Sequence, residues 1–385
     1  MYKNIILPAG LLAGTIIGAG VFALPYVFVK AGILTGLFYL IIFSAVFVLI
    51  HLMYADIVIR TPENRRFAGY MEIYFGKFGF WLAFLMSVLG SILALTIYLV
   101  LSVSFINLIL PNIGDVYKLL IFWLIGSLAI FLNINKVVFS EFLVSLGIIL
   151  IISAIFIFGL GNIGRLQSAS LFNYGNLFLP YGVVLFSMVG RTAITSLLGY
   201  FRANGQSLVL AKKPIILGTI LPAFIYVFFV IGVIGLSKTV SEDSVSGLID
   251  NLPNPILLAL AVMGIVSLWS TYIVIGRDIK KSFEHDLNFS HFISGLIVVA
   301  SPLILYAVGF QQFIKLVGLA GAIFVGLEGI FIILMWLKAQ KHAELTQNNA
   351  ENKILDKINP LIIYFLLLVF AGGIVYALLV NNFVE

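Results

Sequence analysis

Long apolar segments recur along the whole chain, and they restrict its fold more than any other feature. A helix needs about 20 mainly apolar residues to cross the hydrocarbon core of a bilayer, and in lipid its backbone groups must be satisfied within the protein. We delimit eleven such segments: 5–29, 32–59, 80–110, 117–134, 139–160, 177–200, 214–237, 255–277, 291–309, 313–338 and 359–381. The sequence therefore predicts an all-α integral membrane protein with eleven transmembrane helices, forming one domain over residues 1–385.

The composition excludes a soluble body with a single anchor. Of the 385 residues, 62% are hydrophobic and only 10% are charged, a balance typical of membrane proteins. Cysteine is absent, which excludes disulfides and thiolate metal sites. The net charge of +6 would suggest a nucleic-acid partner in a soluble protein. Here the charge belongs to loops, so we expect the lipid bilayer as a partner and no nucleic acid.

The distribution of Lys and Arg predicts the orientation of the chain. Two of the 22 basic residues, Arg191 and Lys315, lie within apolar segments. Four lie in loops on one side of the membrane: Lys30, Lys118, Arg165 and Lys238. All the others lie on the other side, and loops rich in Lys and Arg remain in the cytoplasm. We therefore expect a multi-pass protein with a cytoplasmic N-terminus and an outer C-terminus.

The first apolar segment contains residues that weaken helices. The stretch LLAGTIIGAGVFALPY (11–26) carries Gly14, Gly18 and Gly20 and reaches Pro25. A glycine costs a helix interior about 1 kcal/mol relative to alanine, and a backbone group freed in lipid costs more. One interpretation is close packing, because Gly14 and Gly18 form a small-xxx-small pattern. The other is an interruption that exposes backbone groups to a cavity.

A second interruption favours the cavity. The sixth segment reads LPYGVVLFSMVGRTAITSLLGYF (179–201), with Gly190, Arg191 and Thr192 near its middle. The first and sixth segments each open a set of five, and the loop charges place their starts on opposite sides of the membrane. We expect two inverted repeats and one further helix, at approximately 5–160, 177–338 and 359–381. Interrupted helices at matching positions indicate a transporter with a midplane site, where half-helix N-termini suit a carboxylate.

Several stretches resemble a known family of transporters. GTIIGAGVFALPY looks like the first-helix signature of the amino acid–polyamine–organocation superfamily. LPYGVVLFSMVGRTAITSL is similar to the sixth helix of its aromatic/hydroxy amino acid permease branch, which is tryptophan/tyrosine permease-like, and further similarity lies at 212–229 and 272–287. The resemblance covers nearly the whole chain. It implies the 5+5 inverted-repeat fold of the bacterial leucine transporter, placed in the cell (inner) membrane and moving amino acids by alternating access.

The resemblance also implies where an amino acid would bind, with its carboxylate and amine against backbone groups of the two interrupted helices. The residues expected at the substrate are Thr15, Ile16, Gly18, Ala19, Gly20, Tyr98, Phe186, Gly190, Arg191 and Thr192. The chain departs from the branch at Arg191, where an aromatic residue is frequent, and at Thr195–Ser196, where proline and an acidic residue are common. The class of the substrate side chain is therefore left open.

Two ionisable residues lie deep within segments. Arg191 is about halfway along the sixth segment, and Glu328 lies at a similar depth in the tenth. An ionisable group at membrane depth is costly, so it indicates either a function or a partner. Either the two form a buried ion pair that locks their helices together, or Arg191 contacts substrate or replaces a coupling cation. A gate that makes and breaks the pair during transport would combine both interpretations.

Hydroxyl groups in the eighth segment suggest a cation site. Ser267, Ser270 and Thr271 are spaced i, i+3 and i+4, so they share one helical face. Their oxygens suit sodium, and the resemblance implies that the carbonyls of Gly14 and Ile17 complete the site. The alternative is hydrogen bonding of each hydroxyl to the preceding helical turn. We expect no cofactor, and sodium coupling, proton coupling and ion-free exchange all stay open.

Other functions fit the sequence less well. Of the four histidines only His51 lies within an apolar segment, and it has no metal-ligand spacing to another; the remaining ones are His285, His291 and His342. The sequence contains no G-x-S-x-G or H-E-x-x-H motif, so we do not expect an enzyme. We predict a secondary active amino acid transporter, sodium- or proton-coupled. The alternative is an amino acid exchanger or a membrane nutrient sensor with the same fold; the amino acid and the oligomeric state are left open.

Overall fold

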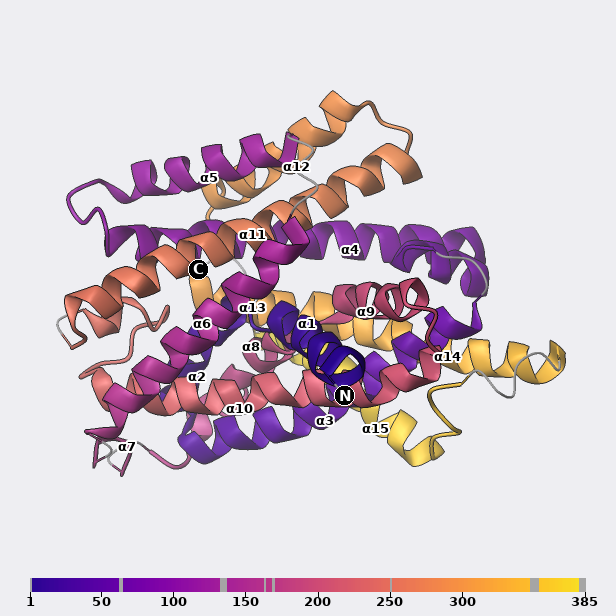
Figure 1. The fold of residues 1–385 in the computed structure, drawn as a ribbon, viewed down its shortest axis with the longest axis horizontal. Helices are drawn as coiled ribbons and strands as arrows, with labels where there is room; N and C mark the ends of the chain where they lie inside the picture. Colours follow the sequence, from indigo (N-terminus) through magenta and orange to yellow (C-terminus); the bar gives the residue numbers. More distant parts are fainter. Residues whose placement is uncertain are drawn as a thin grey trace.

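The protein is helical over every part that the structure describes. The computed structural model describes residues 2–61, 65–131, 137–162, 164–167, 170–249, 251–346 and 353–380, and these residues form no strand. The α-helices (Figure 1) are α1 (Leu7–Ile16), α2 (Leu24–Ala31), α3 (Ile33–Arg60), α4 (Phe67–Asn107), α5 (Asp115–Phe131), α6 (Val137–Leu160), α7 (Gly164–Gln167), α8 (Leu179–Ser187), α9 (Arg191–Ala203), α10 (Lys212–Leu236), α11 (Asn254–Asp286), α12 (His291–Ala307), α13 (Phe313–Leu319), α14 (Gly326–Thr346) and α15 (Pro360–Val380). The prediction of an all-α membrane fold is confirmed.

The apolar segments correspond to these helices, and two of the segments are divided. The 3-10 helix η2 (Ala19–Ala23) separates α1 from α2, and a short break separates α8 from α9. Within the described ranges, seven helices are long and apolar enough to cross a membrane, or eight when the bent pair at the N-terminus counts as one span. Two shorter apolar helices, Leu146–Leu160 and His291–Ala307, accompany them. The number of eleven crossings and the inverted repeats stay predictions.

The helix of the third apolar segment begins earlier than the sequence predicts. α4 starts at Phe67 rather than near residue 80, because its first turns carry Glu72 and Lys77 and an apolar window does not detect them. Gly76 interrupts these turns with φ 69° and ψ −165°, a backbone conformation that favours glycine. The additional turns contribute to the core, since Phe67 and Tyr70 are buried.

Helix α10 makes extensive contacts on one face, while its other face, with Leu217, Leu221 and Phe224, is exposed. It packs against α1, α2, α3 and α6, as Figure 1 shows for its course beside α1 and α3. Glycines permit these contacts: a Cβ at Gly218 would lie 2.7 Å from the carbonyl oxygen of Ala9 in α1, and a Cβ at Gly235 would collide with the carbonyl of Gly159 in α6. Small residues allow membrane helices to approach until their backbones touch, which is the main source of packing energy in lipid.

The two ends of the bundle differ in charge. We call the basic end the one at which Arg60 closes α3, Arg202 closes α9 and Lys212 opens α10. It is the end that the sequence predicts to face the cytoplasm. The opposite end carries Lys30 at the close of α2 and, between α10 and α11, the loop residues 237–249 and 251–253.

Asp56 connects several segments by hydrogen bonds in the interior of the basic end. This residue is fully buried, and its carboxylate accepts hydrogen bonds from Arg60 Nε (2.7 Å), from Trp336 Nε1 (2.9 Å) and from the backbone N–H of Ile354 (3.0 Å). The carboxylate therefore joins α3 to α14 and to the segment that precedes α15. A buried carboxylate needs such partners because an unpaired charge in the interior costs several kcal/mol.

The contact between α10 and α6 provides a test of this packing. Gly235→Ala adds one methyl group against the backbone of Gly159, which cannot move aside as a side chain can. We expect the free energy of unfolding to fall by about 1–3 kcal/mol, the usual cost of overpacking. The measurement is loss of helical circular dichroism during an SDS titration. Gly372→Ala in α15 is the control, because a Cβ there meets nothing within 4 Å; equal stability of both variants would contradict the packing.

Candidate functional site

The first helix is broken between Ile16 and Ala19. The axes of Asn4–Ile16 and Ala19–Ala31 differ by 53°. Ile17 has ψ 88° and Gly18 has φ −126° and ψ −152°, so both residues leave the helical region without entering the left-handed one. Gly18 is required by space rather than by its backbone angles, since a Cβ there would lie 3.1 Å from the Tyr98 hydroxyl.

The second break lies directly against the first. α8 ends at Ser187 and α9 begins at Arg191, with Gly190 as the residue before it. A Cβ at Gly20 would lie 2.5 Å from Ser187 Oγ, and a Cβ at Gly190 would lie 2.6 Å from Ile16 Cγ1. Gly20 of the first break therefore lies against Ser187 at the end of α8, and Gly190 of the second break lies against Ile16 at the end of α1. The structure brings together Ile16, Gly20 and Gly190 of the predicted substrate residues.

Tyr226 of α10 connects the two breaks. Its hydroxyl lies 2.8 Å from the carbonyl oxygen of Ile16 and 2.7 Å from that of Ser187, and the side chain is fully buried. These carbonyls close α1 and α8, where each helix dipole is negative. A hydroxyl has one proton, so it donates to one of the two carbonyls at a time. Nothing in the sequence marks this residue, because it is one position in a helix that is apolar on all sides.

Tyr98 of α4 approaches the first break from another side. Its hydroxyl lies beside the backbone of Ala19 and the side chain of Thr271 in α11. Thr271 Oγ1 also lies 3.2 Å from the Ser267 carbonyl, the back-bonded arrangement that the sequence left as an alternative. The link between the hydroxyl face of α11 and the broken helix therefore runs through Tyr98.

The predicted sodium ligands form a less connected group. Ser267 is buried, and Ser270 Oγ is buried without a hydrogen-bond partner within the described chain. Ile17 donates its N–H to Ala13, and Gly14 lies one turn below in α1. The described residues hold no cluster of three or more His, Cys, Asp or Glu that would suit a metal ion. The sodium site stays a prediction.

Arg191, the first residue of α9, forms an ion pair with Glu328 in the first turn of α14. Arg191 Nε is 2.9 Å from Glu328 Oε1, and both side chains are mostly buried, at 16% and 22% exposed. The guanidinium also lies over the rings of Phe67 (4.4 Å from the centroid) and Tyr54 (5.8 Å), two cation–π contacts. These partners come from α3, α4 and α14, so the charge of Arg191 is directed towards other helices and balanced there.

The remaining predicted substrate residues differ in how far their side chains are buried. Ala19 is buried, whereas Thr15 and Thr192 are exposed, and Thr15 Oγ1 donates to the carbonyl of Leu11. Phe186 is half-buried, and a Cβ at Gly321 would lie 2.9 Å from its backbone nitrogen. Thr15 and Thr192 are therefore not between the half-helices in this conformation.

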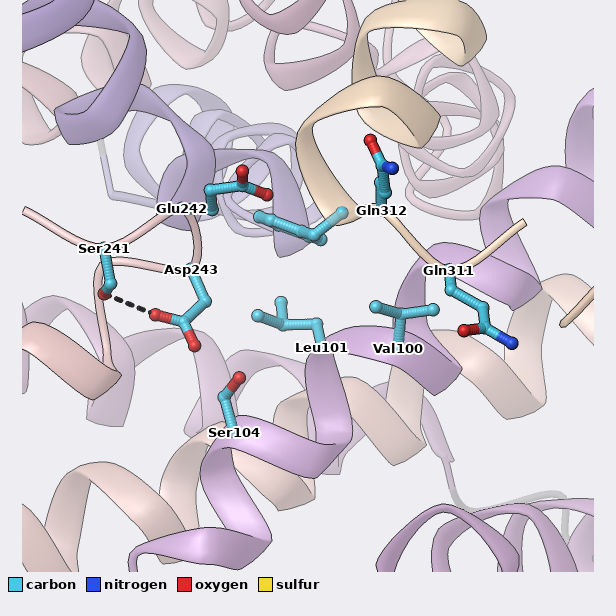
Figure 2. Close-up of a pocket in the computed structure, with 9 residues that line it drawn as sticks. Val100, Leu101, Ser104, Ser241, Glu242, Asp243, Gln311 and Gln312 are labelled. Carbon is cyan, nitrogen blue, oxygen red and sulfur yellow. Dashed lines mark hydrogen bonds between the residues drawn. The ribbon is translucent and has the colours of Figure 1, made fainter. Parts of the chain in front are cut away.

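Two cavities lie at the opposite end of the bundle, beyond the breaks. One, of about 300 Å³, is lined by α4 residues and by the loops around Asp243 and Gln312, and Figure 2 shows its polar side chains. The other, of about 280 Å³, is lined by Tyr26 and Lys30 of α2 and by Leu179 of α8, together with Glu242 and Gln312, which it shares with the first. Both outer half-helices thus border an indentation at this end.

The loop that lines these cavities with Glu242 is held in place by Asp243. Its carboxylate accepts hydrogen bonds from Ser241 Oγ (2.6 Å; Figure 2), from Ser246 Oγ (2.7 Å) and from the backbone N–H of Val245 (3.0 Å). Burial alone would raise the pKa of Asp243, but hydrogen bonds from Ser104, Ser241 and Ser246 outweigh it, so the pKa lies below its usual value. The loop is therefore ordered around an ionised carboxylate.

Two broken helices set against each other within an all-helical membrane bundle are the arrangement of the leucine-transporter fold. The structure resembles that of MhsT in complex with L-phenylalanine, with a TM-score of 0.71 and 14% identity, covering 98% of both chains. It also resembles Mhp1, a nucleobase-cation-symport-1 family transporter, with a TM-score of 0.62 and 13% identity, covering 97% of this chain and 90% of the other. The predicted fold class is confirmed, and the structural neighbours are transporters rather than enzymes.

The sequence assigns the family. Residues 1–379 match the tryptophan/tyrosine permease family, so the chain belongs to that family. No curated protein matches the sequence with significant similarity. The predicted resemblance to the permease branch is confirmed.

Tyr226 offers a direct test of the paired breaks. Tyr226→Phe removes the one hydroxyl that serves the carbonyls of Ile16 and Ser187, and leaves both without this donor. We expect a loss of about 1–3 kcal/mol in the free energy of unfolding, the cost of an unsatisfied buried polar group. SDS titration of the purified protein measures it. Tyr117→Phe is the control because that ring is 68% exposed; if the two variants unfold alike, the hydroxyl does not hold the breaks together.

Proposed function

We propose that the protein is a secondary active amino acid transporter that binds its substrate at the midplane, between the breaks of α1/α2 and α8/α9. The observation that carries the proposal is the reciprocal contact of Gly20 with Ser187 and of Gly190 with Ile16, in a chain of a permease family. Breaks of this kind are tolerated in a membrane where they line a cavity, and they free backbone groups for a ligand.

The polarity of the half-helices suits an amino acid. The first N–H groups of η2 and α9 lack partners within their own helices and mark positive dipole ends, which favour a carboxylate. The carbonyls of Ile16 and Ser187 mark negative ends, which favour an ammonium group. Because Tyr226 donates to one carbonyl at a time, the other is available to an N–H donor of the substrate.

An aromatic substrate agrees with the comparisons. The name of the family refers to tryptophan and tyrosine, and the MhsT structure contains L-phenylalanine. In this chain Phe22, Tyr98 and Phe186 lie on or beside the breaks, and aromatic rings prefer edge-to-face contact, as Phe22 already makes with Phe105. We propose an aromatic L-amino acid as the substrate.

Alternating access requires a closure on each side of the midplane. At the outer side, the cavities around Glu242 and Gln312 provide the approach. At the basic end, the Arg191–Glu328 pair joins α9 to α14, so breaking the pair would release α9. We propose that this pair is the inner gate, with the N-terminus in the cytoplasm, the C-terminus outside and the protein in the cell (inner) membrane.

Uptake into proteoliposomes tests the function. The purified chain is reconstituted, and a panel of labelled L-amino acids is supplied with sodium and pH gradients imposed separately. We expect accumulation of an aromatic amino acid, driven by one of the two gradients.

Accumulation with sodium alone supports the site formed by Gly14, Ile17, Ser267, Ser270 and Thr271. If no amino acid accumulates but one binds and stabilises the protein, the chain is an exchanger or a sensor instead, and exchange across preloaded vesicles separates these.

A substitution at the first break tests the location of the site. Gly18→Leu places a branched side chain against the Tyr98 hydroxyl, only 3.1 Å from the position of the new Cβ, and fills the space between the half-helices. We expect binding and uptake to fall below detection. Gly372→Leu on the exposed face of α15 is the control and should transport normally. Normal uptake by the Gly18→Leu variant would place the substrate elsewhere.

A further inference from the structure

His51 is a buried histidine that the substrate site does not use. It lies in α3, and its side chain is 1% exposed. It lies nine positions before Arg60 at the basic end, which places it about 13.5 Å along the helix from that end at about 1.5 Å per residue. An ionisable group at this depth is costly and indicates a function.

The hydrogen bonds around His51 fix its tautomer. His51 Nδ1 lies 2.9 Å from Thr219 Oγ1 in α10, and Thr219 Oγ1 lies 2.8 Å from the carbonyl oxygen of Ile215. A carbonyl accepts only, so the single hydroxyl proton of Thr219 is donated to Ile215. The Thr219 oxygen must then accept from His51, and Nδ1 carries the proton of the neutral imidazole.

This arrangement leaves His51 Nε2 as a bare acceptor. The atom is buried and has no hydrogen-bond partner among the described residues. A buried polar atom without a partner is destabilising, and such atoms are rare enough in proteins to need a physical reason. The Nε2 lone pair, with Nδ1–H already held, is a site for one proton.

The titratable groups near this depth are engaged elsewhere. On α3 and the helices packed against it they are Tyr54, Asp56, Arg191, Arg202, Tyr226 and Glu328. Asp56 binds Trp336, Arg191 pairs with Glu328 beside Tyr54, and Tyr226 donates to backbone carbonyls. The Arg202 guanidinium lies 3.4 Å from the Val58 carbonyl. α2 and α8 carry their titratable side chains, Tyr26, Lys30 and Tyr181, towards the opposite end. Among these groups, none hydrogen bonds to the imidazole.

One helix face connects His51 to the substrate site. Thr219 and Tyr226 are seven residues apart in α10, two turns on the same side of the helix. The first binds His51, and the second binds the end carbonyls of α1 and α8. Pro222 lies between them and has no N–H, so the Gly218 carbonyl lacks its helical donor and the helix is weakened at this point. Thr219 and Tyr226 thus share one helix face, with a single weakened point between them.

We propose that His51 is the proton-binding site that couples transport to a proton gradient, an inference that rests on the proposed transport function. A proton from water adds to the Nε2 lone pair and gives an imidazolium, while Nδ1–H stays with Thr219. The proton returns to water from the same nitrogen on the other side. In the conformation described here the imidazole is closed off from water, so binding occurs in a conformation that opens beside it. Gly218, next to Thr219, contacts Ala9 and Leu12 of α1, so movement of α1 would uncover this part of α10.

His51→Asn is the central variant. The Asn amide nitrogen occupies the δ position, so it replaces Nδ1–H as a donor to Thr219, but Asn has no group that binds a proton at the place of Nε2. His51→Gln is a second variant, with its amide at the ε position, in case the first fails to fold. His285→Gln is the matched control, since His285 is exposed at the basic end. Exchange of labelled for unlabelled substrate across vesicles without a gradient measures the amount of competent protein in each preparation.

The full chain is reconstituted with a pH difference of one unit, acid outside, and with the membrane potential clamped at zero. The probes are labelled L-tyrosine, L-tryptophan and L-phenylalanine, together with an entrapped pH dye. One proton per substrate supports an accumulation of at most about tenfold for one pH unit. We expect wild type and His285→Gln to approach this ratio and to acidify the lumen. His51→Asn should exchange substrate but fall to a ratio of about 1, without acidification, because no gradient drives it.

The outcomes separate the two proposals. If His51→Asn still accumulates substrate under the pH gradient, or if only sodium drives the wild type, the assignment of His51 is wrong while transport stands. If the wild type neither exchanges nor accumulates any of the three amino acids, the proposal of aromatic amino acid transport fails, and the coupling site falls with it.

Thr219→Val gives a further readout that a purely structural role would not change. Without the Thr219 oxygen, the imidazolium loses the acceptor of its Nδ1–H and is less favoured. We expect the pH of half-maximal uptake to move to a lower value than in the wild type. An unchanged pH profile in a variant that transports would overturn the proton site.

Discussion

The structure depends on the need to satisfy backbone groups that two broken helices release inside a membrane. α1 and α8 both end in the interior, where the hydrocarbon region supplies no water to donate hydrogen bonds to their last carbonyls. In this protein the carbonyls of Ile16 and Ser187 converge on one hydroxyl, that of Tyr226. Convergence requires the two breaks to touch, and they touch because Gly20 and Gly190 carry no side chain. The glycines, the packing of α10 against α1 and the tyrosine therefore act together to satisfy these backbone groups.

The same constraint governs the placement of charge. Two negative helix ends and two positive helix starts at one location complement a zwitterion, but a fixed positive side chain among them would upset that balance. Arg191 is the first residue of α9 and would supply such a charge. Its pairing with Glu328 and its contacts with Phe67 and Tyr54 balance this charge with groups of α14, α4 and α3. The ion pair thus joins α9 to α14 at the first turn of α9, which is the contact that the proposed inner gate uses.

The sequence was sufficient for features that depend on local composition. Apolar segments predicted the helices, and glycines within two of them predicted the breaks, since a glycine inside a membrane helix serves either close packing or an interruption. Features that depend on three-dimensional contact were beyond it. Tyr226 and Thr219 are ordinary residues of an apolar helix until the ends of α1, α8 and the ring of His51 are placed against them. The early start of α4 was missed because Glu72 and Lys77 hide a helix whose other residues, such as Tyr70, enter the core.

Members of one fold can differ in what they carry, because function depends on the side chains that the fold presents. MhsT and Mhp1 share this architecture at 14% and 13% identity, and their structures contain L-phenylalanine and a bromovinylhydantoin. What distinguishes this chain must therefore lie in residues that touch the breaks or act on them. α10 concentrates two of these on one face, with Pro222 between Thr219 and Tyr226. Backbone contacts at Gly218 and Gly235 hold this helix, and Pro222 between them removes one of its helical hydrogen bonds. Thr219, the partner of the proposed proton site, and Tyr226, the donor to the carbonyls of Ile16 and Ser187, lie on one face of this helix on either side of Pro222.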